Sequence, residues 1–273
     1  MLALGLKELS SACKALASFW ACYGCEQLEA SSRKLGAATF HPQMLARALR
    51  ASACKLWYVQ PTFRPFDSDF GLCQKLQRYL QFQVVIKPWA GPSCKLVAQS
   101  LGRLPPGSEL IMRRSKWESA SLCARGLGWE CVLNSIEVAQ ITVFDWLCGL
   151  RCKPSVLEVA YGLERLCYAL SARRQGCGLW ATASEVEFSK LSFGLQDVAL
   201  DLGLFKRAER ALAPNLKLPP AVSFYSIFDE LLEMISLYNA LAAKRALKRS
   251  ALRLVLTRVQ RCVSLAAAAL GGL

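Results

Sequence analysis

The stretch that decides how this chain folds reads Tyr161-Gly162-Leu163-Glu164-Arg165-Leu166, a glycine-hinged turn into an apolar helix with an arginine in its opening turn. Earlier in the chain, Phe63-Arg64-Pro65-Phe66-Asp67 places a second arginine beside a proline-stiffened bend. A guanidinium stays charged and offers a planar fork of donors that suits phosphate oxygens. Two arginines on separate rigid elements therefore predict a site for a bent triphosphate.

The composition indicates a globular protein with a sizeable core. The chain has 273 residues, of which 53% are hydrophobic, enough for one large domain or two smaller ones. No apolar stretch reaches the roughly 18 uncharged residues of a membrane span. The first residues carry no charged region followed by an apolar block, so we expect no secretory signal and a cytoplasmic protein.

Thirteen cysteines and a net charge of +14 both call for an explanation. The cysteines are scattered through predicted strands and helices, which favours reduced thiols that pack as small apolar residues. Cys22 and Cys25, like Cys148 and Cys152, could form half of a zinc site, but neither pair has a partner pair at finger-like spacing. The charge leaves three alternatives open: a nucleic acid, a polyanionic partner subunit, or compositional drift.

Hydrophobic periodicity predicts an α+β fold. Strands are expected at 56–59, 76–87, 109–113, 127–134, 136–144 and 156–160. Helices are expected over the first two dozen residues, at 43–50, from Leu163 onward, and at 196–212, 224–243 and 244–270. The predicted plan is an antiparallel sheet flanked by helices in residues 1–172, a linker at 173–183, and a small C-terminal helical domain in 184–273.

With these elements in place, the sequence resembles the alpha subunit of the bacterial heterotetrameric glycyl-tRNA synthetase, a class II aminoacyl-tRNA synthetase. The resemblance covers nearly the whole chain. It rests on the segments 38–42, 58–61, 79–85, 117–119, 126–130, 133–140, 152–154 and 161–166. It implies the class II antiparallel sheet, an alpha dimer, a separate beta subunit, and tRNA(Gly), glycine and ATP as ligands.

The resemblance also implies roles for individual residues around ATP. Arg64 matches the motif 2 arginine that would hold the α-phosphate, with Arg78 nearby in the same motif. Phe82 matches the motif 2 aromatic on which adenine would stack. Arg165 matches the motif 3 arginine that would hold the γ-phosphate. Glu137 is the candidate ligand for Mg²⁺, which prefers one or two carboxylates together with phosphate oxygens.

The amino-acid pocket is inferred by the same resemblance. Glu158 sits four residues before Gly162, where a related class II enzyme carries the acid that binds the substrate ammonium. Gln81, Trp117 and Gln140 are expected to line the pocket. Glycine needs only the exclusion of bulkier side chains, so bulk in the pocket would discriminate.

Each of these residues also has a plain structural interpretation. Arg64 could pair with Asp67 or Asp69 on the surface, and Phe82 could belong to the core. The basic stretch 244–261 could be a solvated helix face, or it could dock tRNA phosphates or an acidic surface of the beta subunit. For the whole chain, the alternatives to a glycine–tRNA ligase subunit are a non-catalytic paralogue that binds RNA or a partner, and a basic RNA-binding protein without ATP chemistry.

Overall fold

The structure is a computed structural model that describes residues 2–64, 78–102, 104, 106–175, 224–243 and 247–271. Its centre is one sheet in the order β1-β2-β3-β7-β6-β5-β4, antiparallel throughout except for the parallel pair β1 and β2. The strands are β1 (Glu26–Gln27), β2 (Cys54–Phe63), β3 (Arg78–Lys87), β4 (Leu110–Ser119), β5 (Ala124–Leu133), β6 (Ile136–Leu147) and β7 (Leu150–Gly162).

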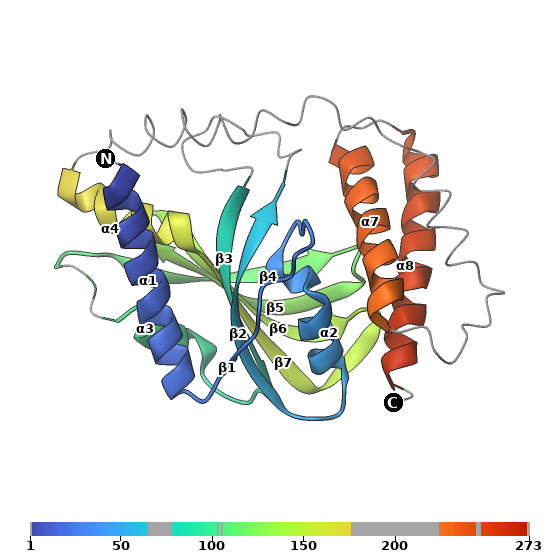
Figure 1. The fold of residues 1–273 in the computed structure, drawn as a ribbon, viewed down its shortest axis with the longest axis horizontal. Coiled ribbons are helices and arrows are strands. Elements are labelled where there is room, and N and C mark those ends of the chain that lie inside the picture. The colour runs from blue at the N-terminus through green and yellow to red at the C-terminus, as the bar shows by residue number, and fades with distance from the viewer. Residues whose placement is uncertain are drawn as a thin grey trace.

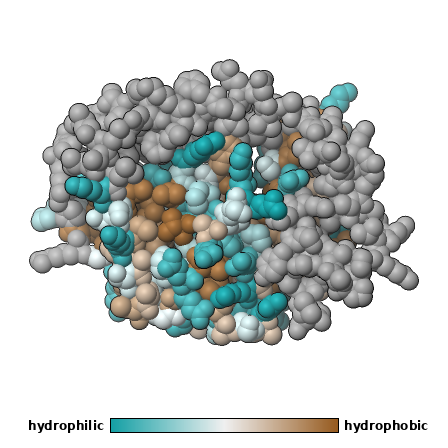
Figure 2. Space-filling view, viewed as in Figure 1, coloured by the Kyte–Doolittle hydropathy of each residue, from teal (hydrophilic) through white to brown (hydrophobic). Residues whose placement is uncertain are grey.

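Helices cover both faces of this sheet (Figure 1). One face carries α1 (Leu2–Cys22), α3 (Ser93–Ser100) and α4 (Leu163–Gln175). The other carries the short 3-10 turn η1 (Ala38–Phe40) with α2 (Pro42–Leu49), α7 (Phe224–Ala243) and α8 (Arg249–Gly271). In the view of Figure 2, hydrophilic side chains gather along the middle of the described surface beside a hydrophobic area.

The predicted α+β class with an antiparallel sheet is confirmed, although several elements differ in length. Strands β2, β4 and β7 extend well beyond their predicted ranges, into flanking residues that are mostly polar or charged and lack a strong apolar signal. Helix α3 and strand β1 were not predicted. Helix α4 continues to Gln175, past the proposed boundary at 172, while most of the linker and the helix expected at 196–212 lie outside the described residues.

The C-terminal helices share a hydrophobic core with the sheet. Phe228 of α7 and Val259 of α8 are buried in the same cluster as Tyr58, Val85 and Phe144 from the strands. Burial of apolar surface between these layers is the main driving force that holds them together. The described part of the predicted domain at 184–273 thus packs directly on the sheet, and its separateness stays a prediction.

The two faces of the sheet differ in chemistry because successive strand residues point to opposite sides. On β3, Phe82, Val84 and Ile86 face α1 and α4 and are fully buried. Gln81 and Gln83 face the other way, together with Glu158 of β7 and Thr142 of β6, which the strand register brings opposite each other. We call the side that carries Gln81, Gln83, Thr142 and Glu158 the polar face.

No disulfide bond joins the cysteines in the described part of the chain, and several of them serve as core residues. Burial raises the pKa of Cys25 to about 11 and the pKa values of Cys131 and Cys167 to about 12. Such thiols are protonated at neutral pH and inert as nucleophiles or metal ligands. None of the helices in the described part of the chain is long and apolar enough to cross a membrane.

Candidate functional site

A row of side chains runs along the polar face of the central strand β7, and we call this row the trough. The residues that point into it are Glu158, Ala160 and Gly162, of which Glu158 is buried while Ala160 and Gly162 are partly exposed. Ala160 lies between Gln83 of β3 and Gln140 of β6, and Gly162 lies opposite Gln81. At about 3.3 Å per residue, Glu158 and Gly162 are about 13 Å apart. This distance suits an extended ligand with different groups at its two ends.

The outer end of the trough carries an arginine and a carboxylate in contact. Arg165, in the first turn of α4, donates from Nη1 to Glu137 Oε2 at 3.1 Å and to the Glu137 carbonyl at 3.3 Å. Both side chains are about one third exposed or more, at 34% and 40%. A cation in the first turn of a helix is unfavourable to the helix dipole, so an anionic partner is needed there. The predicted Arg165 and Glu137 are therefore brought together.

A β-bulge decides which way Glu137 points. On β6, Ala139 lies opposite Cys131, but Glu137 lies opposite Val132, so Val138 is an extra residue. Glu137 and Gln140 are three positions apart and would face opposite sides of a regular strand. The bulge shifts the alternation by one and puts both residues on the polar face.

Helix α4 is tied to the sheet by two further contacts near this end. Glu164 accepts the Leu80 backbone N–H with both carboxylate oxygens, at 2.9 and 3.0 Å. Asn134, in the turn between β5 and β6, donates from Nδ2 to the Ala169 carbonyl at 2.9 Å. Burial raises the pKa of Glu164 to about 7, against the smaller lowering by backbone hydrogen bonds. Glu164 is therefore a positioning residue that holds Arg165 over the trough.

Arg64 follows the end of β2 and is exposed. Its Nε donates to the Gly36 carbonyl at 2.7 Å, and its guanidinium carbon lies 5.6 Å from the centre of the Tyr79 ring. Tyr79 is half-buried and two residues from Gln81, so its ring is on the polar face. The guanidinium is thus preoriented beside an aromatic ring at the edge of the trough.

The inner end of the trough holds a buried carboxyl group. Glu158 is 3% exposed, and its Oε1 accepts a hydrogen bond from Thr39 Oγ1 at 2.8 Å. Burial raises the pKa of Glu158 to about 7, while the neighbouring Thr39 and Gln83 side chains lower it by smaller amounts. A buried carboxylate without a cation is costly, so this position favours a cationic ligand.

The wall beside Glu158 is the segment from Ala38 to His41. The Ala38 N–H donates to Gln81 Oε1 at 2.8 Å, and the buried Tyr58 hydroxyl donates to the Ala38 carbonyl at 3.0 Å. His41 caps α2 by accepting the Met44 N–H at Nδ1 and donates from Nε2 to the Glu29 carbonyl. Burial lowers the pKa of His41, which keeps it neutral and structural. The Gln81 side-chain oxygen is thus occupied by the Ala38 N–H of this segment.

Two predicted ATP ligands lie on the wrong side of β3. Phe82 is 0% exposed in the core, stacked on Trp57 at 5.2 Å and edge-on to Tyr161 at 6.0 Å. Arg78 lies over the Phe63 ring at 5.0 Å, on the side away from Gln81. By strand alternation both side chains point to the side of β3 opposite to Gln81, where Phe82 is buried and Arg78 is exposed, so neither faces the trough.

Gln140 and Trp117 lie on the polar face but are engaged with protein. The Gln140 amide donates to the Trp129 carbonyl at 3.4 Å and to the Ile141 carbonyl at 3.1 Å. Trp117 of the edge strand β4 packs edge-on against Phe144 at 5.6 Å. It reaches Phe144 across Gly126, which lies opposite both residues and carries no side chain. Trp117 therefore closes the apolar end of this face.

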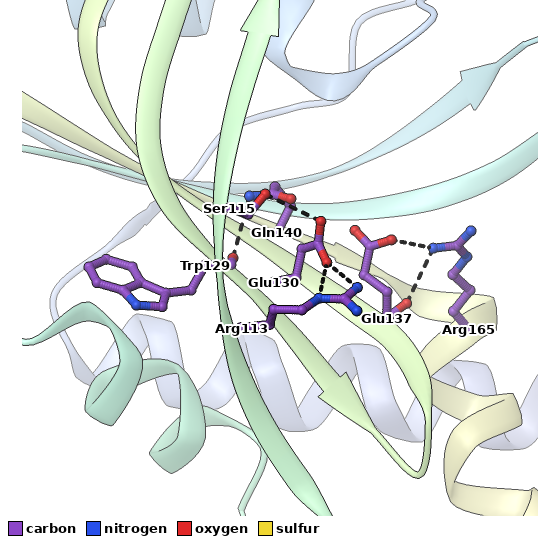
Figure 3. A network of polar contacts seen from close by, with 7 residues as sticks. All are labelled: Arg113, Ser115, Trp129, Glu130, Glu137, Gln140 and Arg165. Carbon is purple, nitrogen blue, oxygen red and sulfur yellow. Dashed lines mark hydrogen bonds and ion pairs between the residues drawn. The ribbon is translucent and has the colours of Figure 1, made fainter.

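A carboxylate that was not predicted completes the polar face. Glu130 of β5 accepts hydrogen bonds from Arg113 Nε at 2.9 Å and from Ser115 Oγ at 3.2 Å, and Arg113 Nη2 also contacts it. Glu130 lies directly opposite Gln140 on the next strand. Figure 3 shows this network together with the Arg165–Glu137 pair.

Sequence reasoning missed five residues of this face, which are Thr39, Tyr79, Gln83, Glu130 and Thr142. Four of them lie on strands. Because residues two apart on a strand share a face, counting from Gln81, Glu158 and Gln140 could have predicted their side of the sheet. Thr39 gave no such signal, since it comes from a 3-10 turn whose approach to β7 is a tertiary contact.

The residues present allow a limited role for Mg²⁺. No group of three or more potential metal ligands occurs in the part of the chain that the structure describes. Magnesium bound with ATP needs only one or two protein carboxylates, since phosphates and waters supply the other oxygens. Glu137 fits this requirement because its carboxylate is partly exposed at the arginine end of the trough.

The chain matches a known protein family over nearly its whole length. A family model described as "Glycyl-tRNA synthetase alpha subunit" matches residues 9–270, which is nearly the whole chain. The match includes the sheet, the trough and the C-terminal helices. It agrees with the resemblance drawn from the sequence motifs.

Proposed function

Because the chain belongs to the glycyl-tRNA synthetase alpha subunit family, we propose that it activates glycine with ATP and, with a beta subunit, transfers glycine to tRNA(Gly). The observation that carries this proposal is the order of groups along the trough: the Glu158 carboxyl at the buried end, the small residues Ala160 and Gly162, then Arg165 at the open end. Glycine and a nucleoside triphosphate present their charges in this same order.

In the activation step, a glycine carboxylate oxygen attacks the α-phosphorus of ATP. A bond forms between them, the bond from the α-phosphorus to the bridging oxygen breaks, and pyrophosphate leaves. Such a reaction requires positioning and charge neutralisation rather than a protein nucleophile. Glu158 would hold the ammonium at the buried end, so that the glycine carboxylate points along the trough toward the phosphates.

The arginines would neutralise the charge that develops on phosphate. Arg64 is held by the Gly36 carbonyl, which supports a preorganised contact with the α-phosphate. Arg165 would leave Glu137 for the γ-phosphate, and Mg²⁺ held by Glu137 would supply further neutralisation of the triphosphate. For adenine we propose Tyr79 in place of Phe82, because the Tyr79 ring is half-buried beside Arg64 on the polar face.

A beta subunit is the proposed partner for the outer side of α8. Exposed residues recur there at helical spacing, with Arg258 and Arg261 between Leu254 and Leu265, which are 56% and 48% exposed. A surface that binds only nucleic acid has no use for the two leucines, whereas protein interfaces combine apolar contacts and arginine. Contact with tRNA, an alpha dimer and a cytoplasmic location complete the proposal on the strength of the family.

Glycine-dependent ATP–pyrophosphate exchange tests the proposal. The purified chain would be assayed alone and with its beta subunit, using alanine and serine as competing substrates. Exchange that requires glycine and is lost in Arg165→Ala, but is kept in the matched variant Arg151→Ala at an exposed position of β7, supports an adenylating subunit. A folded chain that shows no exchange with beta present would instead be a non-catalytic paralogue.

A further inference from the structure

The inner end of the trough contains four buried polar atoms without a hydrogen-bond partner among the described residues. They are Gln83 Nε2 and Oε1, Thr142 Oγ1 and Glu158 Oε2. The three side chains are 0%, 1% and 3% exposed. Buried polar groups in native proteins are nearly always paired, and an unpaired set points to a bound molecule.

The three residues come from adjacent strands and point to the same side. Thr142 of β6 lies directly opposite Glu158 of β7, and Gln83 of β3 lies opposite Ala160, one step along the same face. Side chains in such direct and diagonal pairs are within reach of one another. The Gln83 amide is close enough to Glu158 to lower its pKa, although it makes no hydrogen bond of ordinary geometry with the described residues.

The other polar groups nearby are already engaged. Thr39 holds Glu158 Oε1, the Ala38 N–H holds Gln81 Oε1, and the Gln140 amide donates to two backbone carbonyls. The engaged groups form the walls and fix the Glu158 carboxyl, so that only its Oε2 is directed toward a ligand. The three acceptors that remain are Glu158 Oε2, Gln83 Oε1 and Thr142 Oγ1.

We propose that Gln83, Thr142 and Glu158 form a three-acceptor cage for the primary ammonium group of glycine, and that this cage rejects N-methylated amino acids. The inference rests on the proposed function and adds the groups that recognise the amine. A primary ammonium has three N–H donors, one for each acceptor. An N-methyl group removes one donor and leaves a buried acceptor unpaired, which a site built for hydrogen bonds discriminates against strongly.

Two glutamine substitutions distinguish an effect on glycine binding from an effect on folding stability. Gln83→Met removes an amide with no partner among the described residues, whereas the control Gln60→Met removes an equally buried amide that is paired with Ser31 and the Pro61 carbonyl. We expect Gln83→Met to raise the glycine KM about tenfold or more, with the melting temperature and the ATP KM unchanged. Gln60→Met should show the reverse, a lower melting temperature with an unchanged glycine KM.

A threonine pair tests the N-methyl discrimination. In Thr142→Val the hydroxyl becomes a methyl group of the same shape. The ratio of glycine affinity to sarcosine (N-methylglycine) affinity should therefore be smaller in Thr142→Val than in the unaltered protein. The control Ser100→Ala removes a buried hydroxyl of α3 on the other side of the sheet and should leave the glycine-to-sarcosine ratio unchanged.

Glycine binding measured by calorimetry gives a readout that does not depend on catalysis. Binding of glycine but not sarcosine, weakened at least tenfold by Gln83→Met, supports the cage even if exchange fails. Glycine binding or KM that stays within about twofold in both Gln83→Met and Thr142→Val overturns the cage. In that case buried waters satisfy these atoms, and the adenylation proposal stands or falls by the exchange assay alone.

Discussion

Arg165 Nη1 lies 3.1 Å from Glu137 Oε2, so the first turn of α4 and the bulged start of β6 meet at the open end of the trough. Both groups are assigned to the triphosphate end of the proposed site. With each other as partners, they are held in place before ATP binds. In the proposed function, Arg165 would turn from Glu137 to a phosphate of ATP.

Arg165→Lys should separate charge from geometry at this contact. Lysine keeps the positive charge but lacks the bidentate fork, so we expect a higher ATP KM and exchange reduced on the order of 10-fold. In Arg165→Ala the rate of ATP–pyrophosphate exchange should fall by about 10²-fold or more. The Arg165–Glu137 pair is partly exposed and contributes little to folding, so the melting temperature of both variants should stay close to that of the unaltered protein.

Glycine binding should strengthen as the pH rises toward about 7. Burial raises the pKa of Glu158 to about 7, and the ammonium binds the carboxylate form, so each pH step below this value protonates the group that glycine needs. Calorimetric titrations between pH 5.5 and about 8 check this. Glu158→Gln should bind glycine much more weakly and lose the dependence. An equally steep profile in Glu158→Gln would show that another group titrates.

Glu164 should make folding stability fall as the pH rises from about 4.5 to about 7. Its pKa is raised in the folded state, which therefore binds protons more readily than the unfolded chain in this window, and the contribution is lost once the carboxyl ionises. Glu164→Gln keeps an oxygen that can accept the Leu80 N–H and stays neutral. Above pH 7 the variant should be more stable, on the order of 1–2 kcal/mol, by denaturant titration. Equal stability at pH 5 and pH 8 in the unaltered protein contradicts this.

Gly128→Ala should destabilise the sheet strongly. A Cβ atom at Gly128 would lie 1.8 Å from the Ile141 carbonyl oxygen, which belongs to the neighbouring strand and cannot move without breaking the pairing. We expect a loss of more than about 2 kcal/mol in the free energy of unfolding. Gly36→Ala is the matched control, because its Cβ would meet nothing closer than 3.8 Å. A Gly128→Ala protein as stable as the control would mean that β5 and β6 pair differently.

Sequence reasoning succeeded where local pattern and motif agree. The apolar spacing of Leu16 and Trp20 predicted α1, and Pro42 marked the first residue of α2. Arg165 and Glu137 are in contact, and the roles predicted for Arg64, Arg165, Glu137 and Glu158 stay predictions.

The positions of Gln81 and Phe82 on β3 differ for one physical reason. Gln81 and Phe82 were both assigned to the site, yet adjacent residues of a strand point to opposite faces. The motif alignment placed Phe82 in the right strand, and packing against Trp57 decided its side. Counting by twos from Gln81 would have selected Tyr79 and Gln83 instead.

By itself, the sequence determined the family and the antiparallel sheet with its flanking helices, because these depend on local motifs and on hydrophobic periodicity. Only the tertiary structure decided which side chains share the trough. The Val138 bulge turns Glu137 to the polar face, and the strand register sets Thr142 opposite Glu158. Both follow from pairing between strands, an interaction that no single stretch of sequence contains.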